Sequence, residues 1–108
     1  MYLTRLGELP PVDSPIFTEA ERRYCLRRRN PEPHFAGRYA AKKAACIALS
    51  LAPETPLSDI EVTRLPGRAP TLKLHGDVSR IAEGFGTQNI HVSLSHSGDY
   101  AVALVVME

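Results

Sequence analysis

The sequence predicts a single α+β domain, and three observations lead to that prediction. The chain has 108 residues, which is the size of one compact domain and too short for two independent cores. Apolar residues at helical spacing fill the first half, whereas most of the second half alternates between apolar and polar residues. With 44% hydrophobic and 23% charged residues, the composition is that of a globular protein rather than a disordered chain.

The first half predicts a short edge strand followed by two helices. Three prolines limit residues 1–16 to at most a short edge strand before a loop. A helix is expected over residues 18–29, because Thr18 can cap the amide of Glu21 while the Glu21 carboxylate reaches back. The proline pair that follows should end this helix. A second helix is expected over residues 34–51, with six alanines that make it slim enough to pack closely against a sheet.

The region after the second helix predicts a hairpin and one further helix. Residues 60–65 and 71–74 alternate between apolar and polar side chains on either side of a turn that contains glycine and proline. Asp77 is expected to cap a helix that stops near Gly84 or Gly86, where a left-handed residue is usually glycine.

The last two strands frame a polar turn. Residues 90–94 alternate with their apolar side chains inward, and residues 100–106 are almost continuously apolar. A continuous apolar run is typical of a strand covered on both faces, so we expect the last strand to be central and buried on both sides.

Charge, cysteines and hydropathy exclude several classes of function. A net charge of +1 gives the molecule no strong overall field toward nucleic acid or membrane. The arginine-rich first helix is either a docking surface for an acidic partner or a solvated face. Cys25 and Cys46 lack a CxxC pattern and are expected to be buried thiols. Neither a long apolar run nor a signal-peptide core is evident, which favours the cytoplasm.

Two groups of residues have the chemistry of a phosphate site. Ser95-His96-Ser97 places an imidazole and two hydroxyls at a strand end, where they either bind a phosphate or ribose hydroxyl or only satisfy a turn. Neighbouring residues on a strand point to opposite faces, so a Ser-His hydrolase is rejected. Arg38 and Lys42 are four residues apart and share one face of the predicted helix. This pair of cations either binds a phosphate group or is simply solvated at the surface. The remaining histidines stand singly, without metal-site spacing.

Several segments, taken together, resemble holo-acyl-carrier-protein synthase, a 4'-phosphopantetheinyl transferase. The similar stretches run from about residue 16 to the end in the family's order: Phe17-Thr18-Glu19-Ala20-Glu21-Arg22-Arg23-Tyr24-Cys25, Phe35-Ala36-Gly37-Arg38-Tyr39-Ala40-Ala41-Lys42, Asp59-Ile60-Glu61-Val62, Gly67-Arg68-Ala69-Pro70, Leu74-His75-Gly76 and Val92-Ser93-Leu94-Ser95-His96-Ser97-Gly98-Asp99-Tyr100-Ala101-Val102-Ala103. The resemblance implies a three-stranded antiparallel sheet that wraps a long helix, in a homotrimer with sites between subunits.

The resemblance also implies a reaction and its residues. Coenzyme A would donate 4'-phosphopantetheine to a serine of an acyl carrier protein, with magnesium offsetting the charge on phosphorus. The candidate catalytic residues are Lys42 and His96, at positions that match the family, and Lys43, which does not match it. The implied coenzyme-binding positions are Arg38, Gly67, Pro70, Ser95, His96 and Ser97.

The chain departs from the family at the metal site. The N-terminal strand with its glycine-x-aspartate motif is expected to be missing, and Lys43 stands where the family has a metal-binding glutamate. Ile47 replaces a phosphate-contacting lysine, and Ser50 replaces a glycine. A cation at position 43 repels magnesium, so we expect no metal site, with Glu8 and Asp13 as the only substitute carboxylates considered.

These departures leave three hypotheses for the function. The favoured one is a protein that has lost magnesium-dependent transfer and serves carrier-linked polyketide or peptide biosynthesis, for example as a cyclase or dehydratase. The alternatives are an active transferase in which the Lys43 ammonium takes over part of the metal's charge, and a non-catalytic binding subunit. An acyl carrier protein or carrier-bound intermediate is the expected partner in each case, and coenzyme A is the expected cofactor.

Overall fold

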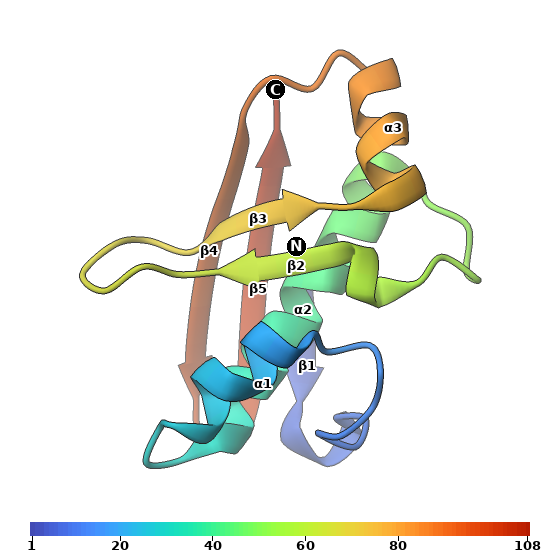
Figure 1. Ribbon diagram of the computed structural model, residues 1–108. Coiled ribbons are helices and arrows are strands. Elements are labelled where there is room, and N and C mark those ends of the chain that lie inside the picture. Colours follow the sequence, from blue (N-terminus) through green and yellow to red (C-terminus); the bar gives the residue numbers. More distant parts are fainter.

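The computed structural model describes all residues from 1 to 108 and has two layers of strands with a long helix between them (Figure 1). The elements in chain order are β1 (Tyr2–Arg5), η1 (Leu6–Glu8), α1 (Glu19–Leu26), α2 (Pro31–Leu49), η2 (Leu57–Asp59), β2 (Ile60–Thr63), β3 (Thr71–Leu74), α3 (Gly76–Gly84), β4 (Ile90–Ser97) and β5 (Tyr100–Met107). No helix is long and apolar enough to cross a membrane. The combination of helices with antiparallel strands confirms the α+β prediction.

A three-stranded antiparallel sheet with the order β1-β5-β4 lies on one side of α2. Its inner face presents Ala101 and Ala103, which are fully buried, as are Ala40 and Ala41 of the helix. Small side chains on both elements allow the helix to lie close to the sheet. This is the slim helix that the alanines predicted.

The N-terminal strand is present, which corrects the expectation that it is missing. Residues 2–5 pair with β5 in antiparallel register, with Leu3 opposite Val102. The strand is short and lies at the sheet's edge, as the prolines after it predicted.

The last strand is central, but it is buried on one face only. Ala101, Ala103 and Val105 face α2, whereas Leu104 and Val106 on the other face are 46% and 45% exposed. The expectation of burial on both faces is wrong for the single chain, because nothing in the chain covers the outer face of this sheet.

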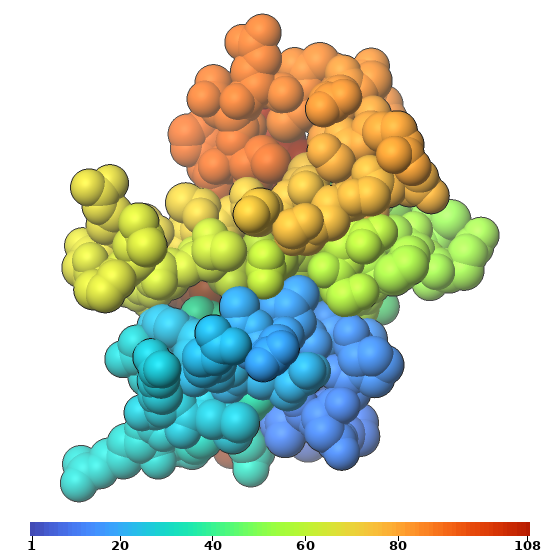
Figure 2. All heavy atoms as spheres, in the orientation of Figure 1, coloured from blue at the N-terminus to red at the C-terminus, as the bar shows by residue number.

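The β2–β3 hairpin forms the second layer, on the opposite side of α2 from the sheet (Figure 1). Figure 2 shows it crossing one face of the molecule in yellow and green, between α1 in blue and α3 in orange. Ile60 and Val62 point into the core and are buried. The predicted hairpin is confirmed.

The helix boundaries differ from the predictions at several places: α1 ends at Leu26 rather than near residue 29, and α2 covers Pro31–Leu49 rather than residues 34–51. The predicted capping box of α1 is present, since Thr18 Oγ1 accepts from the Glu21 amide at 3.2 Å and Glu21 accepts from the Thr18 amide at 2.8 Å. The prolines that follow α1 also begin α2, whose first residue is Pro31. Proline lacks a backbone N–H, but the first N–H groups of a helix have no acceptor within the helix, so none is lost. The N-cap of α3 is His75, whereas Asp77 instead pairs with Arg80 inside the helix.

Candidate functional site

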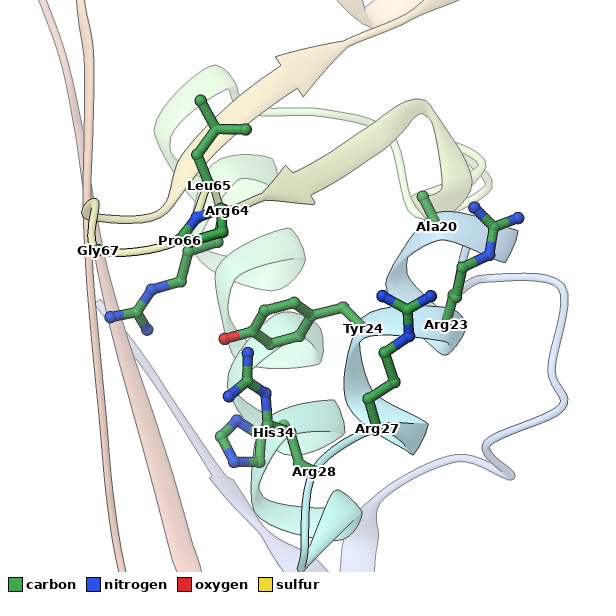
Figure 3. Close-up of a pocket in the computed structure, with 10 residues that line it drawn as sticks. All are labelled: Ala20, Arg23, Tyr24, Arg27, Arg28, His34, Arg64, Leu65, Pro66 and Gly67. Atoms are coloured by element: carbon green, nitrogen blue, oxygen red, sulfur yellow. The ribbon is translucent and has the colours of Figure 1, made fainter.

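A basic cleft of about 510 Å³ opens between α1, the start of α2 and the loop after β2. Four arginines and one histidine dominate its lining, which contains no aspartate or glutamate: Ala20, Arg23, Tyr24, Arg27, Arg28, His34, Arg64, Leu65, Pro66 and Gly67. Figure 3 shows Tyr24 near its centre, with arginines of α1 on one side and Arg64 on the other. We call this hollow the arginine cleft. Its charge suits a ligand with several phosphate groups.

A smaller pocket of about 150 Å³ continues the arginine cleft, because the two share His34 and Arg64. It is lined further by Pro33, Gly37, Arg38, Leu94, Ser95 and His96. The end of β4 and the start of α2 form its walls, so the predicted Ser95 and His96 lie beside Arg38. We include this pocket in the arginine cleft.

Arg38 is the most enclosed cation of the arginine cleft, with 3% of its surface exposed. Its guanidinium carbon lies 4.1 Å from the centre of the Tyr24 ring, and that of Arg28 lies 4.2 Å from the same ring. Nη1 donates to the His34 carbonyl at 3.4 Å, while the buried Nε has no partner. No carboxylate pairs with this guanidinium. A buried charge is costly unless an opposite charge compensates it, so an anion that binds beside Arg38 would stabilise its guanidinium.

Two imidazoles line the same pocket. The ring centres of His34 and His96 are 5.5 Å apart, one ring edge toward the other's face. Burial lowers the pKa of His34, and the charges of Arg38 and a protonated His96 lower it further. His34 is therefore neutral at neutral pH without ligand, and an anion bound beside it would favour its protonated form.

Lys42 is enclosed in the core and does not face the arginine cleft. Its ammonium lies 2.8 Å from a Glu21 carboxylate oxygen, and neither side chain is exposed. Nζ also donates to the carbonyls of Leu57 and Ile60. Burial lowers the pKa of Lys42, and the Glu21 carboxylate opposes this shift. The expectation that Lys42 contacts the substrate is therefore corrected, since this lysine ties α1, α2 and β2 together.

Lys43 lines a separate cavity of about 420 Å³ beside the second half of α2. The other lining residues are Tyr2, Cys46, Ile47, Ser50, Leu51, Ala52, Pro53, Thr55 and Leu57. We call it the Lys43 pocket. It contains the three helix positions that were expected to depart from the family, Lys43, Ile47 and Ser50, and Ser50 has a left-handed φ of 52° at the end of the helix. The predicted departures therefore lie together in space.

The residues of the Lys43 pocket do not fit a magnesium ion. No aspartate or glutamate lines it, and no group of three or more histidine, cysteine or acidic side chains anywhere could hold a metal. Glu8 is exposed beside Arg5 at 3.7 Å, and Asp13 is exposed in a loop. Magnesium prefers oxygen ligands that include carboxylates, whereas the charged group here is an ammonium.

The arginine cleft gathers four of the predicted residues, Arg38, Gly67, Ser95 and His96. Pro70 and Ser97 do not line the cleft, although each lies close along the chain to a residue that does. The prediction missed His34, which was described only as a single histidine without metal-site spacing, and it missed Arg64 and Tyr24. The arginine run of α1 was the available signal, because Arg23, Arg27 and Arg28 line the cleft.

The chain is similar to known proteins over most of its length. The family model of the 4'-phosphopantetheinyl transferase superfamily matches residues 8–105. A holo-[acyl-carrier-protein] synthase of Koribacter versatilis is 42% identical over 95 residues, covering 86% of this chain and 76% of that protein. One from Syntrophotalea carbinolica is 43% identical over 95 residues, covering 86% and 74%.

A fungal protein and two solved structures are also similar. Fatty acid synthase subunit alpha of Schizosaccharomyces pombe is 36% identical over 93 residues, which is 83% of this chain and 5% of that protein. The ACPS-CoA complex of Chronobacterium ammoniagenes superposes with a TM-score of 0.85 at 29% identity, covering 99% of this chain and 93% of that one. The acyl carrier protein synthase of Mycobacterium tuberculosis gives 0.75 at 33% identity, covering 98% and 91%.

Proposed function

This chain belongs to the holo-acyl-carrier-protein synthase family of the 4'-phosphopantetheinyl transferase superfamily, and we propose that it transfers 4'-phosphopantetheine from coenzyme A to a serine of an acyl carrier protein. The observation that carries the proposal is the arginine cleft, which concentrates cations without a lining carboxylate in a chain of this family. Coenzyme A carries a diphosphate and a separate phosphate, and guanidinium groups bind phosphates with paired hydrogen bonds.

The expectation of a repurposed cyclase or dehydratase that has lost transfer is wrong. Identities of 42% and 43% to holo-[acyl-carrier-protein] synthases, over 86% of this chain, favour the active transferase instead. The departures are confined to a few positions around Lys43, whereas the similarity extends over 86% of the chain.

We propose these roles for the residues of the arginine cleft. Arg38 and Arg28, held against the Tyr24 ring, bind phosphate oxygens of coenzyme A. His96 and Ser95 donate to the same phosphates from the end of β4, with Ser97 next to them as the last residue of the strand. Gly67 and Pro70, in the loop between β2 and β3, border the adenine.

The transfer has a simple balance of bonds. The hydroxyl oxygen of the carrier serine forms a bond to the phosphorus that bears pantetheine. The bond from that phosphorus to the bridging oxygen of the diphosphate breaks, and its electron pair leaves with 3',5'-adenosine diphosphate. The serine proton passes to solvent. Cations that face the phosphates stabilise the charge that develops on the leaving group.

We also propose that the chain works as a homotrimer. The arginine cleft and the Lys43 pocket involve different ends of α2 and share no lining residue, and we propose that in the trimer a second copy brings one pocket opposite the other. The outer face of the sheet supports this, because Leu3, Leu104 and Val106 leave an apolar surface uncovered. Light scattering should give three times the chain mass; a stable monomer would exclude the trimer.

The transfer is tested with apo carrier protein, coenzyme A and the purified chain. Mass spectrometry should detect the added phosphopantetheine on the carrier. Arg38→Met should slow the reaction at least tenfold, from the loss of charged hydrogen bonds worth about 1.5–3 kcal/mol. Arg80→Met is the matched control, since Arg80 pairs with Asp77 on exposed α3. No modification of any carrier by the unaltered chain would reject the proposal.

The similarity to a fatty acid synthase subunit favours a carrier of fatty acid synthesis as the acceptor. We keep the carriers of polyketide synthesis as a second acceptor class, which the same assay can compare. Initial rates with equal concentrations of the two carriers decide between them.

A further inference from the structure

The Lys43 pocket contains a positive charge that the chain itself does not neutralise. Lys43 is the only charged residue that lines the pocket, and it takes part in none of the chain's ion pairs. The Lys43 ammonium lies over the ring of Tyr39, whose centre is 5.7 Å from Nζ. The pocket therefore lacks an anion.

The other polar groups of the pocket do not supply that anion. Cys46 is half-buried, and burial raises the pKa of its thiol although Lys43 and Lys42 oppose the shift. The thiol therefore stays neutral. The hydroxyls of Tyr2, Ser50 and Thr55 can accept or donate hydrogen bonds but carry no charge at neutral pH. A ligand must bring the negative charge.

The walls of the pocket are partly apolar. Ile47, Leu51 and Leu57 contribute apolar side chains to the lining, and 60% of Ile47 is exposed. The Lys43 ammonium repels a divalent cation, so the residues here disagree with the magnesium that the family resemblance implies.

We infer that the Lys43 ammonium takes the place of the metal, neutralising the diphosphate of coenzyme A so that binding and transfer require no divalent cation. The inference rests on the proposed transferase function and on assembly of the two pockets between copies. The Lys43 ammonium offsets the charge on the oxygen that leaves with 3',5'-adenosine diphosphate, while the serine proton passes to solvent.

The alternative for Lys43 is an ordinary surface lysine whose stem covers apolar residues and whose ammonium stays in water. The two cases differ in what coenzyme A binding requires. A surface lysine contributes little to the affinity, whereas a charge-assisted contact to phosphate is worth about ten- to a hundredfold.

Calorimetry with coenzyme A as the probe distinguishes them. The unaltered chain should bind coenzyme A in EDTA with an affinity within about twofold of that in magnesium. Lys43→Met should weaken binding about ten- to a hundredfold in EDTA, and Lys43→Arg should restore most of it because the charge returns. Lys73→Met is the matched control, since Lys73 is exposed on β3 and lines none of these pockets. Circular dichroism checks that each variant is folded.

The results separate this inference from the proposed function. If EDTA abolishes both binding and carrier modification and magnesium restores them, the transferase function stands and the inference is wrong. If a folded Lys43→Met variant binds coenzyme A as the unaltered chain does, the inference is also wrong. If the unaltered chain neither binds coenzyme A nor modifies a carrier under either condition, both proposals fail.

Discussion

Replacing Lys42 by methionine tests whether this lysine holds the fold together or takes part in the reaction. In the structure its ammonium is enclosed and makes three polar contacts, to the Glu21 carboxylate and to the carbonyls of Leu57 and Ile60. Methionine has a similar length but no donor. The Glu21 carboxylate would keep only the amides of Thr18 and Val62 as partners.

Removing one partner of a buried ion pair costs about 3–5 kcal/mol, because the other charge stays buried without compensation. For a chain of this size we expect the midpoint of thermal unfolding to fall by about 12 to 20 °C. That loss is a large part of the stability of a typical domain, which is about 5–15 kcal/mol.

Urea unfolding followed by far-ultraviolet circular dichroism measures this loss, which suits a chain without tryptophan. The double variant Glu21→Gln with Lys42→Met should recover part of the stability, because no unpaired charge then remains buried. Lys42→Met within 1 kcal/mol of the unaltered chain, combined with lost transfer, would refute the structural role and restore the catalytic one.

Three further predictions concern the ligand, pH and the first helix. Arg38→Met should weaken binding of 3',5'-adenosine diphosphate about tenfold or more by calorimetry; unchanged affinity would contradict the role given to the arginine cleft. Burial raises the pKa of Glu61, but the hydrogen bonds that its carboxylate accepts from Thr18 and His75 have the larger combined effect and hold this pKa below its usual range. Its contribution to stability should therefore be present above the unfolded pKa of about 4.3 and disappear as pH falls through the folded value. Urea titrations of Glu61→Gln against the unaltered chain from pH 7 to pH 3 should show the gap closing; a gap that widens would be inconsistent with this sign. Thr18→Ala should cost about 1–2 kcal/mol by removing the cap of α1, and a loss below 0.3 kcal/mol would show that the capping box contributes little.

Local signals in the sequence were sufficient for most of the fold. The capping box at Thr18 and the alternation in residues 60–74 depend on neighbours a few positions away, so these elements were predictable. The start of α2 was placed too late because a proline pair has two meanings, the end of one helix or the first turn of the next. Burial of the last strand depended on what covers its outer face, and the sequence does not contain that information.

The candidate site was only partly predictable, for a geometric reason. Spacing placed Arg38 and Lys42 on one helix face, but it could not show that Glu21, from another helix, draws Lys42 inward. Arg64 and His34 meet in one pocket only after the hairpin has folded over α2. Contacts between residues that are distant in sequence leave no local pattern in the chain.

The position of β5 in the middle of the sheet has a consequence for how the protein is made. Its two neighbours are the first and the fourth strands along the chain, and both pair with it rather than with each other. During synthesis, β1 leaves the ribosome long before β5 has been made. Until then, the backbone N–H and C=O groups of β1 that pair with β5 stay exposed to water. Pairing between segments so distant in sequence slows folding, and an unpaired edge can join another chain in the meantime. β5 is synthesised after both of its neighbours, so neither β1 nor β4 can take its place in the sheet until β5 has been made.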